Sequence, residues 1–295
     1  MNARIGPIAR PALAAAIFAL AASAGPLDAA GPQAKPGRAV VLEYKMPAGR
    51  SLTYQYSQEM TQAMEAQGQA VDSQVSVASA MTFRAKGPKG RDLLVGATID
   101  DMRMTVSTNM TGDMSPDMSE AKGKSFDMVL SPLGAEIDSA GAEAVTYSVA
   151  GEAQNVSAYF KAFFPDLLGK PVKVGDTWPS SDKIDQGSAA MKMHVENQYV
   201  HTLEGFETVD GLECARISAQ VTGTVSGSGS QGGMDMTMSG ANKGQTVWFF
   251  AVKEGIFVKA VNETTADVAV DLAAAGLTIP VTEKIKTEIK LTGRS

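Results

Sequence analysis

The chain has 295 residues, of which 44% are hydrophobic and 20% charged, and its 32 acidic and 26 basic side chains give a net charge of −6. This length and hydrophobic content are enough for one large β domain or two small ones, and they exclude disorder over most of the chain. The charges form no long run of one sign, so neither a nucleic acid nor an anionic membrane surface is expected as a partner.

Residues 1–24 have the pattern of a secretory signal peptide. Arg4 and Arg10 precede an uncharged, mostly apolar run that ends in small residues at Ala24. Signal peptidase requires this order, with small side chains at positions −3 and −1. The run is shorter than the roughly 20 residues that cross a bilayer. We therefore predict cleavage near Ala24, with the Ala29–Ala30 pair as second choice, and export of a soluble chain without a membrane span to the periplasm or the cell exterior.

Residues 25–37 are expected to be a linker, after which the chain has the pattern of β-strands. Between Gln74 and Phe83, apolar and polar residues alternate with the two-residue period of a sheet that has one buried face. The next strand contains Leu93 to Ile99. Its apolar phase then slips by one residue at Asp100–Asp101, which predicts a β-bulge.

The final strand has one apolar and one basic face. Its apolar positions run from Val281 to Leu291 and are interrupted by Glu283 and Thr287. The opposite face carries Lys284, Lys286 and Lys290. Lysines in this arrangement are typical of an exposed sheet face or a sheet edge.

One helix is expected from Ala153 to Leu168. Its apolar residues follow a 3.6-residue period, and Pro165 predicts a break near Phe164. Two polar segments rich in small residues, 109–124 and 222–233, are expected to be mobile loops.

The two halves of the chain share a spacing. The turn at Gly90 matches that at Gly211, and the turn at Gly134 matches that at Gly255, both at an offset of 121 residues. This indicates an internal duplication, with a first β-rich half at 38–152, a connecting helix at 153–170 and a second β-rich half at 171–295. The predicted fold is mainly β, a β-rich α+β chain in which duplicated curved sheets or half-barrels have a helix near their junction. Periplasmic carriers of lipids and lipoproteins are similar to this in outline.

The segment Phe164-Pro165-Asp166-Leu167-Leu168-Gly169-Lys170-Pro171-Val172-Lys173-Val174-Gly175-Asp176-Thr177-Trp178 carries a family resemblance. It resembles the FP-x-L-P-x-K-x-V-x-V-G-D-x-W signature of uncharacterised exported bacterial proteins, in which it joins two β-rich halves; Leu168 stands at the position of the second proline. The resemblance implies export and a two-halved fold, and no activity. On physical grounds Trp178 is expected to be a buried anchor.

No residue pattern indicates catalysis, so we predict a protein that is not an enzyme and has no cofactor. His194 and His201 are an odd number of residues apart on an expected strand and should face opposite sides. The Asp100–Asp101 pair has the pattern of a solvated bulge. The single cysteine, Cys214, cannot pair within the chain and is expected to be a small buried hydrophobe.

Methionine carries the one functional indication, with 16 residues of this type in the chain. Two sets of methionines alternate with other residues, so that each set shares one face of a strand. The first set is Met102 and Met104, and the second is Met234, Met236 and Met238. Three interpretations remain open. The methionines fill an irregular β core, or they line a cavity for an apolar, lipid-like ligand, which is the preferred function, since thioethers adapt to varied apolar surfaces.

The third interpretation is capture of Cu(I), a metal that prefers soft sulfur ligands, by Met191, Met193 and His194. Strand alternation spaces the sulfur atoms along a line about 7 Å apart, which favours a groove over one metal centre. A structural protein of the cell envelope, or one that contacts another envelope protein, is the further alternative.

Overall fold

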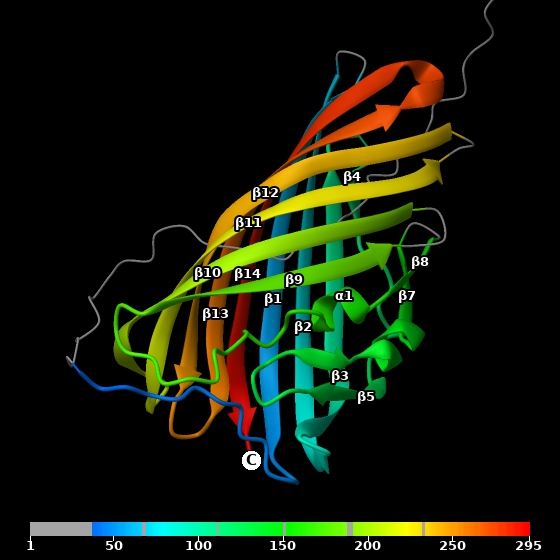
Figure 1. Cartoon of the computed structure of the whole chain (residues 1–295). Helices are drawn as coiled ribbons and strands as arrows, with labels where there is room; N and C mark the ends of the chain where they lie inside the picture. Colours follow the sequence, from blue (N-terminus) through cyan, green and yellow to red (C-terminus); the bar gives the residue numbers. More distant parts are fainter. Residues whose placement is uncertain (1–36, 67–68, 111, 150–151, 188–190, 232–233) are drawn as a thin grey trace, which may run out of the picture.

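A computed structural model describes residues 37–66, 69–110, 112–149, 152–187, 191–231 and 234–295 (Figure 1). The predicted signal peptide, and the predicted linker except for residue 37, lie outside the described residues. The described part is mainly β, as predicted, and contains a 12-stranded antiparallel sheet and a two-stranded hairpin. Its elements are β1 (Ser51–Ala66), β2 (Gln69–Lys89), β3 (Asp92–Thr108), β4 (Gly112–Met114), β5 (Ser125–Leu130), β6 (Glu136–Asp138), the 3₁₀ turn η1 (Ala140–Ala144), β7 (Thr146–Val149), β8 (Glu152–Asn155), α1 (Ser157–Phe160), β9 (Thr177–Gly187), β10 (Met191–Val209), β11 (Leu212–Gln231), β12 (Met234–Ala251), β13 (Ile256–Leu272), η2 (Ala273–Ala275) and β14 (Leu277–Arg294).

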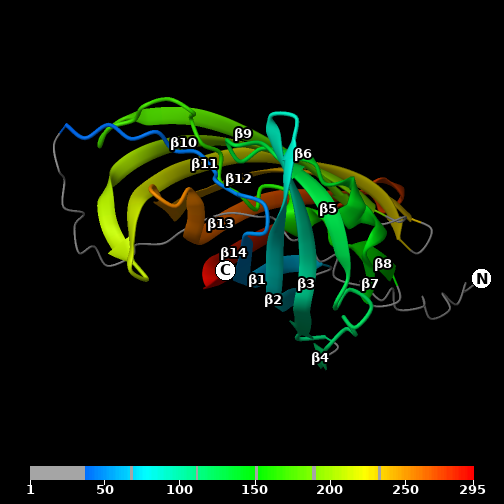
Figure 2. The ribbon, with the colours of Figure 1, turned by 90° about the horizontal axis from the view of Figure 1, so that it is seen from below.

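Two runs of consecutive strands form the large sheet. The first starts at β1 and ends at the edge strand β6, while the second starts at the other edge, β9, and ends at β14. The strand order is β6-β5-β3-β2-β1-β14-β13-β12-β11-β10-β9, with β4 beside β3. The pairing of β1 with β14 therefore joins the two runs at the centre of the sheet. Figures 1 and 2 show the sheet bending around α1, so that its concave side forms an inner face.

The glycines that mark the predicted repeat all stand at turns. Gly90 and Gly211 lie in the β2–β3 and β10–β11 turns with φ of 69° and 79°. Gly134 and Gly255 lie in the β5–β6 and β12–β13 turns with φ of 101° and 65°, a backbone conformation that favours glycine. In the first run, β5 and β6 have only 6 and 3 residues, whereas β12 and β13 have 18 and 17. Descent from one duplicated unit stays a prediction.

Aromatic side chains fill one end of the inner face. Tyr54 is fully buried, its ring centroid lies 5.5 Å from that of Phe163 and 5.8 Å from that of Phe83, and its hydroxyl donates to the Phe257 carbonyl oxygen at 2.8 Å. Edge-to-face packing of this kind stabilises a core beyond the area that it buries. We call this region the aromatic end, and its members are Tyr44, Tyr54, Phe83, Phe163, Phe164, Phe250 and Phe257.

The connecting helix is much shorter than predicted. Residues 152–155 form β8, and α1 covers only Ser157–Phe160. Ala162 adopts a left-handed φ of 59°, which ends the helix, and Pro165 prevents its continuation. The apolar stripe that indicated a long helix instead supplies side chains to the aromatic end and to the contact of Phe160 with Phe126, whose ring centroids are 4.7 Å apart.

The strand predictions around the bulge are confirmed. The β2–β3 register passes from the pair Ala80–Asp101 to the pair Met81–Ile99, so Asp100 is the extra residue of a bulge. His194 and His201 face opposite sides of β10, with His201 buried and His194 half-buried.

Of the two alternatives predicted for the lysine-bearing strand, the exposed sheet face is confirmed, and the prediction of a loop at 222–231 is wrong. The lysine-bearing strand β14 lies between β1 and β13, so its lysines occupy an outer sheet face rather than an edge. Residues 222–231, expected to be a loop, belong to β11. The segment 109–124 is a loop in its described residues outside β4, as predicted, and it buries Met118 and Ala121 in the core.

The glycines of β11 allow the sheet to curve. A Cβ atom at Gly223 would lie 2.5 Å from the side-chain oxygens of Asn197 and Asn242, and one at Gly227 would lie 2.8 Å from the Met238 sulfur. Side chains of the neighbouring strands β10 and β12 thus close over β11. The composition of this part of β11 resembles that of a flexible loop. Its glycines are needed instead for tertiary packing, which composition does not show.

Adding a methyl group at position 223 is expected to destabilise the protein by about 1–3 kcal/mol, the usual range for overpacking a filled site. The measurement is the free energy of unfolding of Gly223→Ala in urea. Ser228→Ala, at an exposed outward position of the same strand, is the matched control and should stay within about 0.5 kcal/mol of the parent. Equal stability of the two variants would show that the inner face is not packed as described.

Candidate functional site

One line of register-paired residues crosses eight neighbouring strands on the inner face, and six of its eight members have polar side chains. We call it the polar row, and it consists of Asp182 (β9), Asn197 (β10), Gly223 (β11), Asn242 (β12), Ala266 (β13), Glu283 (β14), Gln62 (β1) and Ser73 (β2). None of its members has an aliphatic side chain larger than a methyl group. Residues paired in this way lie about 5 Å apart on one sheet face, so the polar row brings six polar side chains into one band across the inner face.

Hydrogen bonds join the polar row in two groups. The Gln62 amide donates to Glu283 Oε1 at 2.8 Å, and the Ser73 hydroxyl donates to Gln62 Oε1 at 3.3 Å. On the other side of Ala266, Asn242 Nδ2 donates to Asn197 Oδ1 at 2.9 Å. These contacts hold the side chains in place between the strands.

Three buried oxygens in or beside the polar row lack a hydrogen-bond partner among the described residues. They are Glu283 Oε2 and Asn242 Oδ1 in the row, and Thr264 Oγ1 on β13, two residues from Ala266. Glu283 is only 2% exposed, Thr264 3% and Asn242 4%. A buried polar group left without a partner costs about 1–3 kcal/mol. Native proteins leave few such groups, so three in one region indicate that something else binds there.

Burial changes the acidity of the carboxyl groups near the polar row. Desolvation raises the pKa of Glu283 from 4.5 to about 7, and the hydrogen bond from Gln62 opposes this only in part. Desolvation and the neighbouring Asp182 raise the pKa of Asp166 from 3.8 to about 6, and burial raises the pKa of Asp182 as well. Glu136 accepts the backbone N–H groups of Ala162 and Phe164, yet burial raises its pKa to about 8.

A hydroxyl and an imidazole meet near the edge of the inner face, without the arrangement of a catalytic triad. Ser180 Oγ lies 2.8 Å from His201 Nε2, and the imidazole stacks between the rings of Trp178 and Tyr199. His201 Nδ1 has no partner among the described residues, so no carboxylate orients the ring there. Desolvation lowers the pKa of His201 to about 4, which makes it a poor base at neutral pH.

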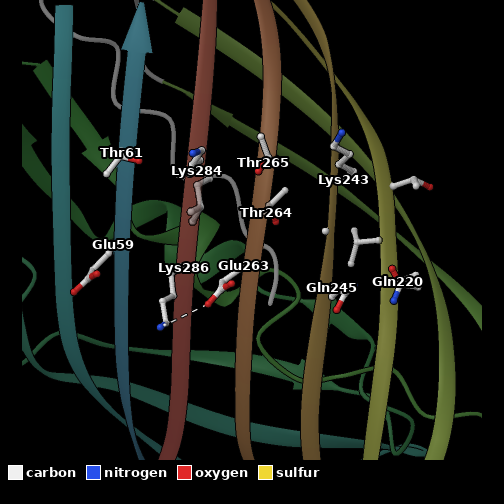
Figure 3. Close-up of a pocket in the computed structure, with 14 residues that line it drawn as sticks. Glu59, Thr61, Gln220, Lys243, Gln245, Glu263, Thr264, Thr265, Lys284 and Lys286 are labelled. Atoms are coloured by element: carbon white, nitrogen blue, oxygen red, sulfur yellow. Dashed lines mark ion pairs between the residues drawn. The ribbon is translucent and has the colours of Figure 1, made fainter. Parts of the chain in front are cut away.

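The outer face carries a separate groove of about 590 Å³ across β1, β14, β13, β12 and β11 (Figure 3). Exposed side chains line it, including Lys243, Lys284 and Gln245. Its one drawn ion pair, between Lys286 and Glu263, has an N–O distance of 3.6 Å and is solvent-exposed. Exposed pairs contribute about 0–1 kcal/mol to stability. The groove has the character of a solvated face, in contrast to the buried polar row behind it.

The predicted methionines lie in two parts of the inner face. Met102 and Met104 on β3 and Met238 on β12 are buried in the main core. Met236 belongs to a second apolar cluster with Leu272, Ile279 and Val281, and Met234 at the start of β12 is half-buried. We call the end of the inner face opposite the aromatic end the methionine end, and its methionines are Met64, Met191, Met193, Met236 and Met238.

The structure does not bring the proposed copper ligands to one point. Met191 and Met193 face inward on β10, while the His194 ring faces outward between Asp185 and Glu196, at 2.6 Å and 3.3 Å. Within the described part of the chain, no group of three or more His, Cys, Asp or Glu side chains is placed to hold a metal ion.

The other residues weighed in the sequence analysis lie in surroundings that indicate a role in the fold. Cys214 is fully buried, and desolvation raises the pKa of its thiol to about 12. At the bulge, Asp101 binds Lys122 at 2.8 Å and Arg103 at 2.9 Å. Trp178 is buried as predicted. None of the helices among the described residues is long and apolar enough to cross a membrane.

Sequence reasoning missed most of the polar row. The interruption of an apolar strand face by Glu283 and Thr287 was the available signal. The same signal exists in β1 and β10, where Gln62 and Asn197 interrupt inward-facing apolar positions. That these interruptions lie on one line depends on the register of the strands.

No family model and no curated protein matches the sequence. Among solved structures, an exported protein with a YmcC-like fold from Bacteroides fragilis is 9% identical, with 86% of this chain and 99% of that chain covered and a TM-score of 0.27. An outer membrane channel from Pseudomonas putida is 10% identical, with 84% and 97% covered and a TM-score of 0.34. A DUF1329 family protein from Desulfovibrio piger is 11% identical, with 82% and 84% covered and a TM-score of 0.15. At these TM-scores the similarities carry no argument about function.

The raised pKa of Glu283 predicts that stability falls as the pH rises. Between its unfolded pKa of 4.5 and its folded pKa of about 7, the folded state binds more protons than the unfolded state, so each pH unit costs about 1.4 kcal/mol. The contribution of Glu283 to the free energy of unfolding is fully present below pH 4.5. It is lost as the pH rises through about 7, and the total loss is about 3 kcal/mol. Urea unfolding at pH 5 and pH 8 measures this difference.

Glu283→Gln keeps the acceptor for Gln62 and removes the ionisation, so it should reduce the pH dependence. Glu59→Gln, on the exposed outer face of β1, is the matched control and should leave the pH dependence unchanged. An identical loss of stability between pH 5 and pH 8 in the parent and in Glu283→Gln would mean that Glu283 is not buried in the folded protein.

Proposed function

We propose that the protein is exported and binds an amphipathic, lipid-like ligand along the inner face of its sheet, without catalysing a reaction. The observation that carries the proposal is the position of the partnerless oxygens of Glu283 and Asn242 on the polar row, beside the methionine end, with that of Thr264 on the aromatic side of the row. One region thus combines buried hydrogen-bonding groups with adaptable apolar side chains.

A ligand with two unlike ends suits this arrangement. A purely apolar molecule would leave the buried oxygens without partners, at a cost of about 1–3 kcal/mol each. A polar head group at the polar row would satisfy them, while an acyl chain would contact the methionine end. Methionine side chains are unbranched and polarizable, and they adapt to ligands of varied shape.

The rim of the methionine end is the entry route in this proposal. Met64, Met191 and Leu277 are half-buried there and pack against the cluster that contains Met236. Half-exposed apolar side chains leading to a buried polar group offer a path on which an acyl chain stays in apolar surroundings.

Export and the lack of catalysis rest on separate observations. The predicted signal peptide at residues 1–24 supports export. The lowered pKa of His201 disfavours acid–base chemistry by that histidine at neutral pH, and the raised pKa of Cys214 disfavours nucleophilic chemistry by the thiol.

A monoacylglycerol with a photoreactive diazirine in its acyl chain tests the proposal. After illumination, mass spectrometry of peptides should locate the label on inward positions of β10, β12 and β13 near the methionine end. Met191→Glu places a charge in the path of the acyl chain and should weaken binding at least 10-fold in a native mass spectrometry titration, equivalent to about 1.4 kcal/mol.

The matched control is Ser228→Glu, which adds the same charge to an exposed outward position on β11 and should bind within about 2-fold of the parent. Labelling confined to the outer groove, or equal loss of binding in both variants, would refute an inner-face site.

A further inference from the structure

We infer that the polar end of the ligand is a hydrogen-bond donor without negative charge, an ammonium or hydroxyl group, which binds at Glu283 and Asn242 on the polar row. The inference rests on the proposed function and specifies its ligand class.

The partnerless atoms define the donor character of the head group. Glu283 Oε2 is an acceptor when the carboxyl is ionised, and Asn242 Oδ1 is always an acceptor, because the Asn242 amide nitrogen already donates to Asn197. The third partnerless atom, Thr264 Oγ1, can accept as well. Asn197 Nδ2 is a partnerless donor in the same row. A phosphate or carboxylate could accept from it but would leave the three oxygens without donors, whereas a hydroxyl group can both donate and accept.

The charges around the polar row define the sign of the head group. The row carries two carboxyl groups, Asp182 and Glu283, and no lysine or arginine. The register lines on either side of it, from Ser180 to Val75 and from Ile184 to Val71, contain no charged residue. Asp166 of the connecting segment adds a carboxyl group close to Asp182. An anionic head group would face like charges with no cation to offset them, which is costly away from water.

The spacing of the row allows one head group to reach both acceptors. Asn242 and Glu283 stand on strands two apart, about 10 Å between backbones, and both pair in register with Ala266. The methyl group of Ala266 is the only inward side chain between them on the sheet surface. Ala266 is itself fully buried, so a small head group that enters beneath the groups covering it would contact Glu283, Asn242 and Thr264 from one position.

Competition against the photoreactive monoacylglycerol tests the inference with three ten-carbon molecules. Decylamine, decanol and decanoate have the same ten-carbon chain and differ in the head group. We expect decylamine, decanol or both to reduce labelling at concentrations at least 10-fold lower than decanoate does. Decanoate competing as well as the other two would overturn the inference and leave the proposed function standing. Absence of inner-face labelling by the probe itself would instead refute the proposed function.

Glu283→Gln separates the two head groups and confirms the location. If the natural head group is an ammonium, this variant should weaken competition by decylamine at least 10-fold, because the negative charge is lost. If it is a hydroxyl, the glutamine NH₂ group that replaces Oε2 can donate to the hydroxyl oxygen. Competition by decanol should then change less than about 3-fold, and decylamine should be the weaker competitor in the parent. Glu59→Gln should behave as the parent for all three molecules. Decylamine that competes best in the parent and equally well in Glu283→Gln would show that the head group binds elsewhere.

Discussion

The antiparallel pairing of β1 with β14 is the contact on which the rest of the architecture depends. It joins two separate runs of strands into one sheet, and it does so between segments at opposite ends of the described chain. The same register places Gln62 opposite Glu283, so that the amide donates to the carboxylate at the centre of the inner face. A slip of one residue would turn every apolar side chain of β14 to the outside and its lysines to the inside. This register therefore joins the two halves of the sheet and sets the Gln62–Glu283 part of the candidate site.

The curvature of the sheet follows from small side chains and is stabilised at one end by large ones. Gly223 and Gly227 let β10 and β12 approach over β11, while the connecting segment contributes Phe163 and Phe164 to the aromatic end. The inner face thus changes along its length from rigid aromatic packing, through the polar row, to methionines. Aromatic rings hold a fixed geometry, whereas methionine adapts, so the adaptable end is the one suited to a ligand.

Local patterns gave the strands and the bulge, because alternation and a one-residue slip are properties of neighbouring residues. The failed predictions concern residues whose conformation is decided by distant contacts. Phe163 and Phe164 follow a helical period, but their rings pack in the aromatic end and the backbone there is neither helix nor strand. The glycines and serines of β11 have the composition of a loop, yet atoms of both neighbouring strands lie where a Cβ atom would stand at Gly223 and Gly227.

The candidate site was partly visible in the sequence for the same reason. Glu283 could be recognised as an interruption of an apolar face, since that needs only the period of its own strand. Its alignment with Asn242 and Asn197 depends on the register of several successive strands. The methionines were recognised by alternation, but their division between the core and the methionine end is a property of the whole sheet.

A crystal structure of the protein purified with its natural ligand, at a resolution that shows ordered water, tests the central claim most directly. The account predicts elongated density that starts within hydrogen-bond distance of Glu283 Oε2 and Asn242 Oδ1 and continues along the methionine end to Met236. Ordered water alone on those two oxygens, with the methionine side chains packed against one another, would contradict it, because buried water would then complete the polar row without a ligand.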